Sequence, residues 1–216
     1  VLVRLLAANP NNVAALMMQA HLHFLRGRDE LAIDAFIRVL QLEPKNEEAT
    51  YWLGRVYYQL NRFHAAVSQF KRVLQMDPKS YKAYDNLGLC YEGLNQEEEA
   101  IRHYLKALDL VHQDHPEYDW PYGNLANLLL KRDENEKALQ LATEAARRNP
   151  SSARNFYLTG KALSRVAKTE EALEWLRRSI ELDPGYPEPR YLLGQLYVKL
   201  GRKQDAEREL QAFQEL

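Results

Sequence analysis

Residues 47–80 read EEATYWLGRVYYQLNRFHAAVSQFKRVLQMDPKS, and this stretch decides the fold. Its apolar residues recur at intervals of three and four residues in two successive segments, which is the pattern of helices with one buried face. The first segment contains the small residue Gly54 and the second contains Ala66, so that two helix backbones can approach closely there. The stretch therefore predicts an antiparallel helical hairpin that ends at Pro78.

The same stretch recurs along the chain, and proline marks its period. Prolines follow one another at spacings of 34, 34, 38, 34 and 34 residues, at Pro10, Pro44, Pro78, Pro116, Pro150 and Pro184. When the stretches are aligned on these prolines, one position is alanine in all six: Ala32, Ala66, Ala100, Ala138, Ala172 and Ala206. A fixed period of this length indicates a solenoid of stacked helical hairpins.

Segments 51–57 and 84–91, YWLGRVY and YDNLGLCY, carry small and aromatic residues in the same register. In these residues the chain resembles the tetratricopeptide repeat family, whose unit is a 34-residue helix-turn-helix. The resemblance implies an all-α fold, namely a right-handed α-solenoid, or superhelix, of stacked antiparallel helix pairs. Because the resemblance covers the whole chain, we expect a single array over residues 1–216.

The register divides this array into repeats. We expect residues 1–12 to end a preceding repeat, and six repeats to follow at about 13–46, 47–80, 81–118, 119–152, 153–186 and 187–216. We number the positions of a repeat from the third residue after the proline that precedes it, so that Val13 is position 1 of the first repeat. In this numbering the first helix should cover positions 1–14 and the second helix positions 17–30. The repeat at 81–118 has four additional residues, about one helical turn. They predict either a longer second helix or loop, or a change of pitch that exposes Trp120 to the groove.

Composition argues against several classes of function. A net charge of −1 gives no reason to expect nucleic acid or a membrane as a partner. No phosphate-binding loop, HExxH, CxxC or nucleophile elbow occurs, so we expect neither enzymatic activity nor a cofactor. His112 and His115 lack a second ligand pair, and we expect no metal site. Cys90 occupies a register position that is apolar in every repeat, which predicts a place in the core.

The two ends and the absence of a signal peptide give further expectations. The N-terminal residues are apolar, and the last repeat is not followed by a polar closing helix, which solenoids need for solubility. We therefore expect a segment of a longer chain that can self-associate. No signal peptide is visible, and we expect a cytoplasmic protein.

The resemblance also implies which residues a partner would contact. In the family the first helices line the concave face. The candidate residues at those positions here are Tyr51, Arg55, Asn86, Trp120, Asn124, Asn127, Lys131, Arg154, Tyr157, Lys161 and Arg165. Asparagine amides donate and accept hydrogen bonds, and can therefore hold a peptide backbone. We expect no facing acid within repeats four and five, and a concave cluster of like charge attracts a carboxylate or phosphate.

We therefore expect a non-enzymatic scaffold that binds a peptide segment of a partner protein in its concave groove. Some relatives hold the C-terminal carboxylate of chaperone peptides with a clamp of Lys, Asn and Arg residues. Asn124 and Arg154 match two of its positions, but Leu158 replaces the second basic residue, so we do not expect that ligand. Three alternatives stay open: an oligomeric assembly module acting through uncapped array ends, an accessory domain of a larger enzyme, and phosphate or nucleic-acid binding by repeats four and five.

Overall fold

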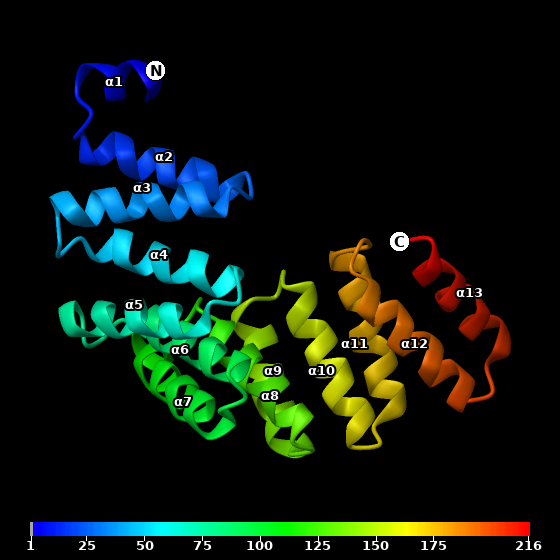
Figure 1. Ribbon diagram of the computed structural model, residues 1–216. Helices are drawn as coiled ribbons and strands as arrows, with labels where there is room; N and C mark the ends of the chain where they lie inside the picture. Colours follow the sequence, from blue (N-terminus) through cyan, green and yellow to red (C-terminus); the bar gives the residue numbers. More distant parts are fainter. Residues whose placement is uncertain (1) are drawn as a thin grey trace. The chain divides into compact units, whose positions relative to one another are not determined.

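The computed structural model describes residues 2–216, without the side chains of residues 3, 113 and 114, and every regular element in that range is an α-helix (Figure 1). The chain divides into two compact units, one up to Leu110 and one from Val111. The first unit contains α1 (Leu2–Ala8), α2 (Val13–Leu25), α3 (Asp29–Leu42), α4 (Glu47–Gln59), α5 (Phe63–Met76), α6 (Tyr81–Gly93) and most of α7 (Glu97–Asp114). The second contains α8 (Trp120–Lys131), α9 (Asn135–Arg148), α10 (Ala153–Arg165), α11 (Thr169–Leu182), α12 (Pro187–Lys199) and α13 (Lys203–Gln214).

The helices lie where the register predicts them. Four second helices, α3, α5, α9 and α11, cover positions 17–30 of their repeats without deviation. Most first helices begin at position 1 and end one residue before position 14, because that residue is the C-cap. Side chains complete several N-termini: Asn12 and Asn46 each accept a hydrogen bond from a main-chain N–H three residues ahead, at 2.9 Å.

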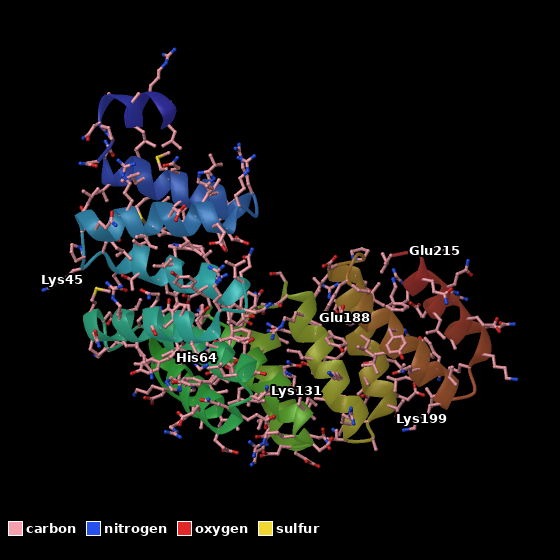
Figure 2. All side chains as sticks on the ribbon, in the orientation of Figure 1. Lys45, His64, Lys131, Glu188, Lys199 and Glu215 are labelled. Atoms are coloured by element: carbon pink, nitrogen blue, oxygen red, sulfur yellow. The ribbon has the colours of Figure 1, made fainter. Side chains whose placement is uncertain are left out.

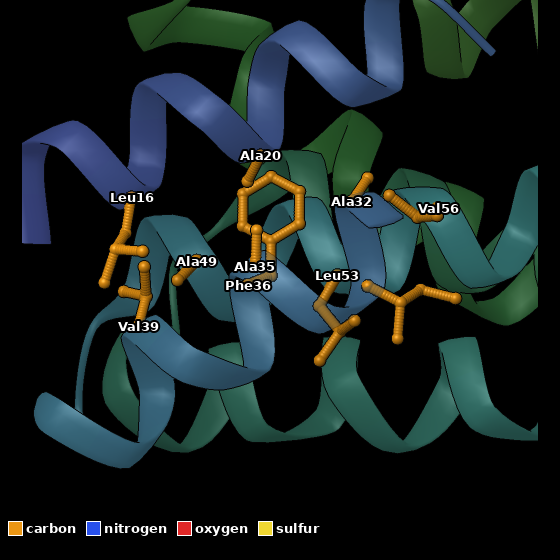
Figure 3. Packing of buried hydrophobic residues seen from close by; sticks show 10 residues of the cluster. Leu16, Ala20, Ala32, Ala35, Phe36, Val39, Ala49, Leu53 and Val56 are labelled. Carbon is orange, nitrogen blue, oxygen red and sulfur yellow. The ribbon is translucent and has the colours of Figure 1, made fainter. Parts of the chain in front are cut away.

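Consecutive helices pack in pairs, and small residues make the close contacts possible. The six aligned alanines are all buried. A Cβ added to Gly88 would lie 2.4 Å from the Tyr104 ring, so the aromatic side chain fills the space that the glycine leaves. Figure 3 shows the same arrangement in the first unit, where Phe36 packs beside Ala20 and Ala32. Within each unit, burial of these apolar stripes holds one helix pair to the next.

The turns between paired helices require a left-handed residue. Gly27 and Gly201 have positive φ angles of 64° and 71°, and Asn61, Asn95 and Asp133 have φ angles of 56–57°. These residue types tolerate that conformation. The fifth repeat uses Ala167 at a φ of 61° instead, which strains the backbone because its Cβ crowds the following carbonyl.

The additional residues of the third repeat lengthen its second helix. Helix α7 has 18 residues, whereas the other long second helices have 14, so the structure contains the longer helix that was one of the two expectations. No helix between residues 2 and 216 combines the length and the hydropathy that crossing a membrane requires. The single array over residues 1–216 and its division into repeats stay predictions.

Candidate functional site

The second unit brings eight of the eleven candidate residues onto neighbouring first helices. Helix α10 contacts both α8 and α12 directly, in addition to its contacts with second helices. Helix α8 carries Trp120, Asn124, Asn127 and Lys131, and α10 carries Arg154, Tyr157, Lys161 and Arg165. We call this set of eight residues, of which Asn124 is buried, the α8–α10 face.

Arg154 links the two helices of this face. Its Nη2 donates a hydrogen bond of 2.8 Å to Oδ1 of Asn124, and its guanidinium carbon lies 5.5 Å from the centroid of the Trp120 ring. Gly123 leaves the space for this arrangement, since a Cβ there would lie 2.8 Å from Nη1 of Arg154. Trp120 itself is 51% exposed. Both partners of the Arg154 guanidinium are uncharged, so they fix its position without neutralising it.

Lys161 lies two turns further along α10, among other cations. Its Nζ is 5.8 Å from the centroid of the Tyr157 ring, and that ring packs edge-on against Tyr186 at 5.5 Å. Burial lowers the pKa of Lys161, and the positive charges of Arg165 and Lys131 lower it further. Burial likewise raises the pKa of the Tyr157 hydroxyl. The mutual effect of these charges indicates that Lys131, Lys161 and Arg165 form a cluster of like charge.

The expectation that no acid faces these cations is wrong. Arg165 Nη1 lies 3.7 Å from Oδ1 of Asp133, and the charge of Glu188 opposes the lowering of the Lys161 pKa. Both partners of the Arg165 pair are more than half exposed, and such surface pairs contribute little. Figure 2 labels Lys131 at the end of α8 and Glu188 at the start of α12. The α8–α10 face is therefore basic, and Glu188 on α12 adds a negative charge near Lys161.

A pocket beside Arg154 was missed by the sequence analysis. It has a volume of about 430 Å³ and is lined by Ser151, Ala153, Arg154, Leu182, Asp183 and Tyr186. Burial raises the pKa of the Tyr186 hydroxyl well above its ordinary range. The candidate residues were taken from the inward-facing positions of the first helices alone. Several residues of this pocket lie instead in the loops before α10 and α12, so that pattern could not indicate it.

The first unit contains the other three candidates, Tyr51, Arg55 and Asn86. Asn86 is 5% exposed, and its Nδ2 donates to the Lys82 carbonyl at 2.8 Å and to the Tyr51 hydroxyl at 3.1 Å. Arg55 lies over the Trp52 ring at 5.5 Å. The Asn86 amide group is thus used inside the protein, where it holds Tyr51 in place.

The three candidate asparagines therefore differ in whether their side-chain amides are available to a partner. Asn124 is 3% exposed and accepts the hydrogen bond from Arg154. Asn127 is half-buried, and no residue of the described chain makes a hydrogen bond with its side chain. Of the three, Asn127 has the amide that is best placed to meet a peptide backbone.

Other reactive groups lie outside this site. Cys90 is buried, which confirms its expected place in the core, and burial raises the pKa of its thiol to about 12. Among the residues that the structure describes, no group of three or more His, Cys, Asp or Glu is arranged to hold a metal ion.

Family comparisons match most parts of the chain. Models described as tetratricopeptide repeat match residues 1–47, 80–151 and 187–216, and one described as TPR repeat matches residues 168–201. A model described as anaphase-promoting complex, cyclosome, subunit 3 matches residues 30–107. No curated protein sequence matches the chain.

Solved structures of low sequence identity share the fold. PilF of Pseudomonas aeruginosa matches with a TM-score of 0.80 at 18% identity, covering 94% of this chain and 95% of that one. MamA of Desulfovibrio magneticus RS-1 matches with a TM-score of 0.67 at 19% identity, covering 79% and 94%. YrrB, described as a TPR protein with an unusual peptide-binding site, matches with a TM-score of 0.59 at 20% identity, covering 87% and 95%.

Proposed function

We propose that this chain, which is a tetratricopeptide repeat protein, binds a peptide segment of a partner protein at the α8–α10 face and is not itself an enzyme. Repeats of this family form elongated surfaces on which partners bind. The peptide-binding site named for YrrB supports this general role, since that protein has the same kind of fold.

One observation carries the proposal: the half-exposed Trp120 ring stands beside a cation that uncharged groups hold in place. Tryptophan, tyrosine and arginine are the residues that dominate binding energy at protein interfaces. The α8–α10 face presents Trp120, Arg154 and Tyr157 on adjacent helices. A partner that covers Trp120 would bury its apolar ring and contact a preorganised guanidinium, which lowers the entropic cost of binding.

The remaining candidates take supporting roles in this proposal. Asn127 would hydrogen-bond the main chain of the partner segment, and Lys131 and Arg165 would contact its acidic groups. The first unit has its own candidate contacts, Tyr51 and Arg55, which would meet a partner separately from the α8–α10 face, while Asn86 positions Tyr51 through their hydrogen bond.

Site-specific cross-linking tests this function. A photo-activatable benzoylphenylalanine at Asn127 should capture the partner, whereas the same group at Lys137, an exposed residue on α9, should not. With the captured partner in hand, Trp120→Ala should weaken its binding by about 2 kcal/mol or more, as truncation of an interface hot spot does. Capture from Lys137 in place of Asn127, or unchanged affinity of the folded Trp120→Ala variant, would contradict the proposal.

A second candidate role is self-association through α2. Met18, Leu22 and Leu25 on this helix are 59%, 37% and 80% exposed, and their spacing of four and three residues places these apolar side chains on one side of the helix. Sedimentation analysis tests this role, with Leu25→Glu as the disrupting variant. A shift from dimer to monomer in that variant would support it, and a monomeric parent chain at every concentration would exclude it.

A further inference from the structure

We propose that the partner segment bound at the α8–α10 face is acidic, placing one carboxylate beside Arg154 and a second beside Lys161. The inference rests on the proposed function, because it names the chemistry of a ligand for the same face. The carboxylates belong to Asp or Glu side chains within a segment of the partner protein. Arg154 and Lys161 are thus assigned as the residues that select the ligand.

The first step concerns the charge of Arg154. Across the described residues, no carboxylate forms an ion pair with it, and its contacts are the Asn124 amide oxygen and the Trp120 ring. By contrast, Arg62, Arg148 and Arg190 each pair with a glutamate of their own chain. A guanidinium that is fixed but not neutralised retains its capacity for a carboxylate, which it can bind with two parallel hydrogen bonds.

The second step concerns Lys161, which is half-buried beside like charges. Within the described chain it makes no ion pair, and its ammonium lies over the Tyr157 ring. Burial lowers the pKa of Lys161, and the neighbouring positive charges of Arg165 and Lys131 disfavour its charged form further. An anion bound here would relieve this repulsion and would interact with several cations at once.

The spacing of the two cations specifies the ligand further. Arg154 and Lys161 are seven residues apart on α10, which places them on one side of the helix and about 10 Å apart along its axis. A peptide in the extended polyproline II conformation advances about 3.1 Å per residue with three residues per turn, so carboxylates three residues apart lie on the same side of the peptide and about 9 Å apart, close to the spacing of the two cations. Trp120 and Tyr157 offer apolar surface for the side chains between them. The best ligand is therefore an extended segment with the pattern acid-x-x-acid.

The number of cations favours a peptide over a nucleic acid. The face has four cationic side chains, and Arg165 already lies near Asp133. Glu188 adds a negative charge near Lys161, and the chain as a whole has a net charge of −1. Nucleic-acid sites neutralise a run of phosphates with a continuous basic surface. A short acidic segment needs two or three cations and fits this face better.

The test titrates synthetic peptides against the full chain carrying Trp52→Phe and Trp175→Phe, so that Trp120 is its remaining tryptophan. The acidic probe is an acetylated and amidated extended peptide with aspartates three positions apart, and the control probe has asparagine at both positions. We expect the acidic probe to change Trp120 fluorescence and to bind about tenfold or more tightly than the control. Probes with aspartates one or six positions apart should bind more weakly than the acid-x-x-acid probe.

Variants assign the effect to the two cations. Arg154→Gln and Lys161→Gln should each weaken binding of the acidic probe severalfold, and Lys137→Gln on α9 should leave it unchanged. Glu188→Gln should strengthen it, because a repelling charge is removed. Circular dichroism of every variant checks that the fold is intact. Equal binding of the acidic and neutral probes, or equal effects of Arg154→Gln and Lys137→Gln, would overturn the inference.

The remaining outcomes separate this inference from the proposed function. If the acidic probe does not bind, while the cross-linker at Asn127 still captures a partner, the acidic chemistry is wrong and the peptide-binding role stands. If single-stranded DNA binds more tightly than the acidic probe, with a steep loss of affinity in salt, both the acidic peptide and the protein partner are wrong.

Discussion

Arg148 holds the end of the long helix α7, and its removal should destabilise the second unit far more than removal of its neighbour Arg147. The Arg148 side chain is 2% exposed, and it pairs with Glu144 at 2.8 Å. Its guanidinium also donates to four main-chain carbonyls at 3.3–3.5 Å, those of Val111, His112, His115 and Pro116. These carbonyls lie at the C-terminal end of α7 and just beyond it, where a helix lacks donors for its last carbonyl groups.

The contacts of Arg148 set the expected magnitude. A hydrogen bond from a charged donor contributes about 1.5–3 kcal/mol net, and the four bonds are long and share one guanidinium, so we count them as one such bond. The guanidinium also lies over the Tyr122 ring at 4.3 Å. A partly desolvated contact of this kind adds about 0.5–2 kcal/mol. Arg148→Ala should therefore lower the free energy of unfolding by about 3 kcal/mol.

Arg147 supplies the matched control. It pairs with the same Glu144 at 2.7 Å, but its side chain is 69% exposed and makes none of the contacts with α7. Exposed pairs are largely screened by water, so Arg147→Ala should change stability little. The difference between the two variants isolates the contacts that only Arg148 makes.

Urea unfolding followed by circular dichroism measures both variants, and amide hydrogen exchange at residues 108–112 reports the local effect. We expect faster exchange there in Arg148→Ala alone, because the end of α7 loses its anchor. Equal stability losses in the two variants would refute the reasoning, and so would a loss in Arg148→Ala below about 0.5 kcal/mol, the usual range for surface changes.

Four other predictions follow from single positions. Gly88→Ala should cost about 1–3 kcal/mol, because its Cβ would meet the Tyr104 ring at 2.4 Å; an unchanged melting temperature would contradict this. Ala167→Gly should stabilise by about 0.5–1 kcal/mol, since glycine relieves the positive φ angle of 61°, and a lower melting temperature would show that strain is absent. The pKa of Glu144 is lowered from 4.5, mainly by its hydrogen bond with Arg147. The contribution of Glu144 to stability is therefore present above pH 4.5 and is lost as the pH falls through the lower folded-state pKa. Glu144→Gln should accordingly reduce the fall of the melting temperature with decreasing pH in this range. With its pKa raised to about 12 by burial, the Cys90 thiol should react with a thiol reagent at pH 8 only as the protein opens, so fast labelling of the native protein would argue against burial.

The helices could be predicted from the sequence because each register position is sampled six times. One alanine or glycine in a helix says little, but alanine at the position of Ala66 in every repeat indicates a contact that admits no larger side chain. The lengthening of α7 followed from the same alignment, as one of two alternatives. Cys90 could be placed in the core because its equivalents in the other repeats are apolar.

The partners of polar side chains could not be predicted in this way. Asn86 and Asn124 share one register position, yet Asn86 donates to Tyr51 and Asn124 accepts from Arg154. The amide has both a donor and an acceptor end, and the residue next to it decides which end is used. The neighbour comes from the preceding repeat in the first case and from the following repeat in the second. The register determines the position of a side chain on its helix, but it does not determine which neighbouring group forms a hydrogen bond with it.

The error about facing acids has a similar origin. Asp133 is a turn residue, and Glu188 belongs to the next repeat, so neither occupies a first-helix position of repeats four and five. Charges act over distances of several ångströms, and a charged neighbour on the adjacent helix pair matters as much as one on the same helix. Counting acids within two repeats therefore underestimated the negative charge near Lys161.

Arg148 and Arg154 show how the structure separates a cation that stabilises the fold from one that is available for binding. The Arg148 side chain is almost completely buried, and a carboxylate and four carbonyl oxygens surround its charge. Arg154 is held with comparable definition, but by an amide oxygen and an aromatic ring, and neither carries an opposite charge. Both side chains are held by specific contacts, so such contacts alone do not indicate a binding role. The lack of an ion pair within the described chain does, because a bound carboxylate would supply at Arg154 what Glu144 already supplies at Arg148.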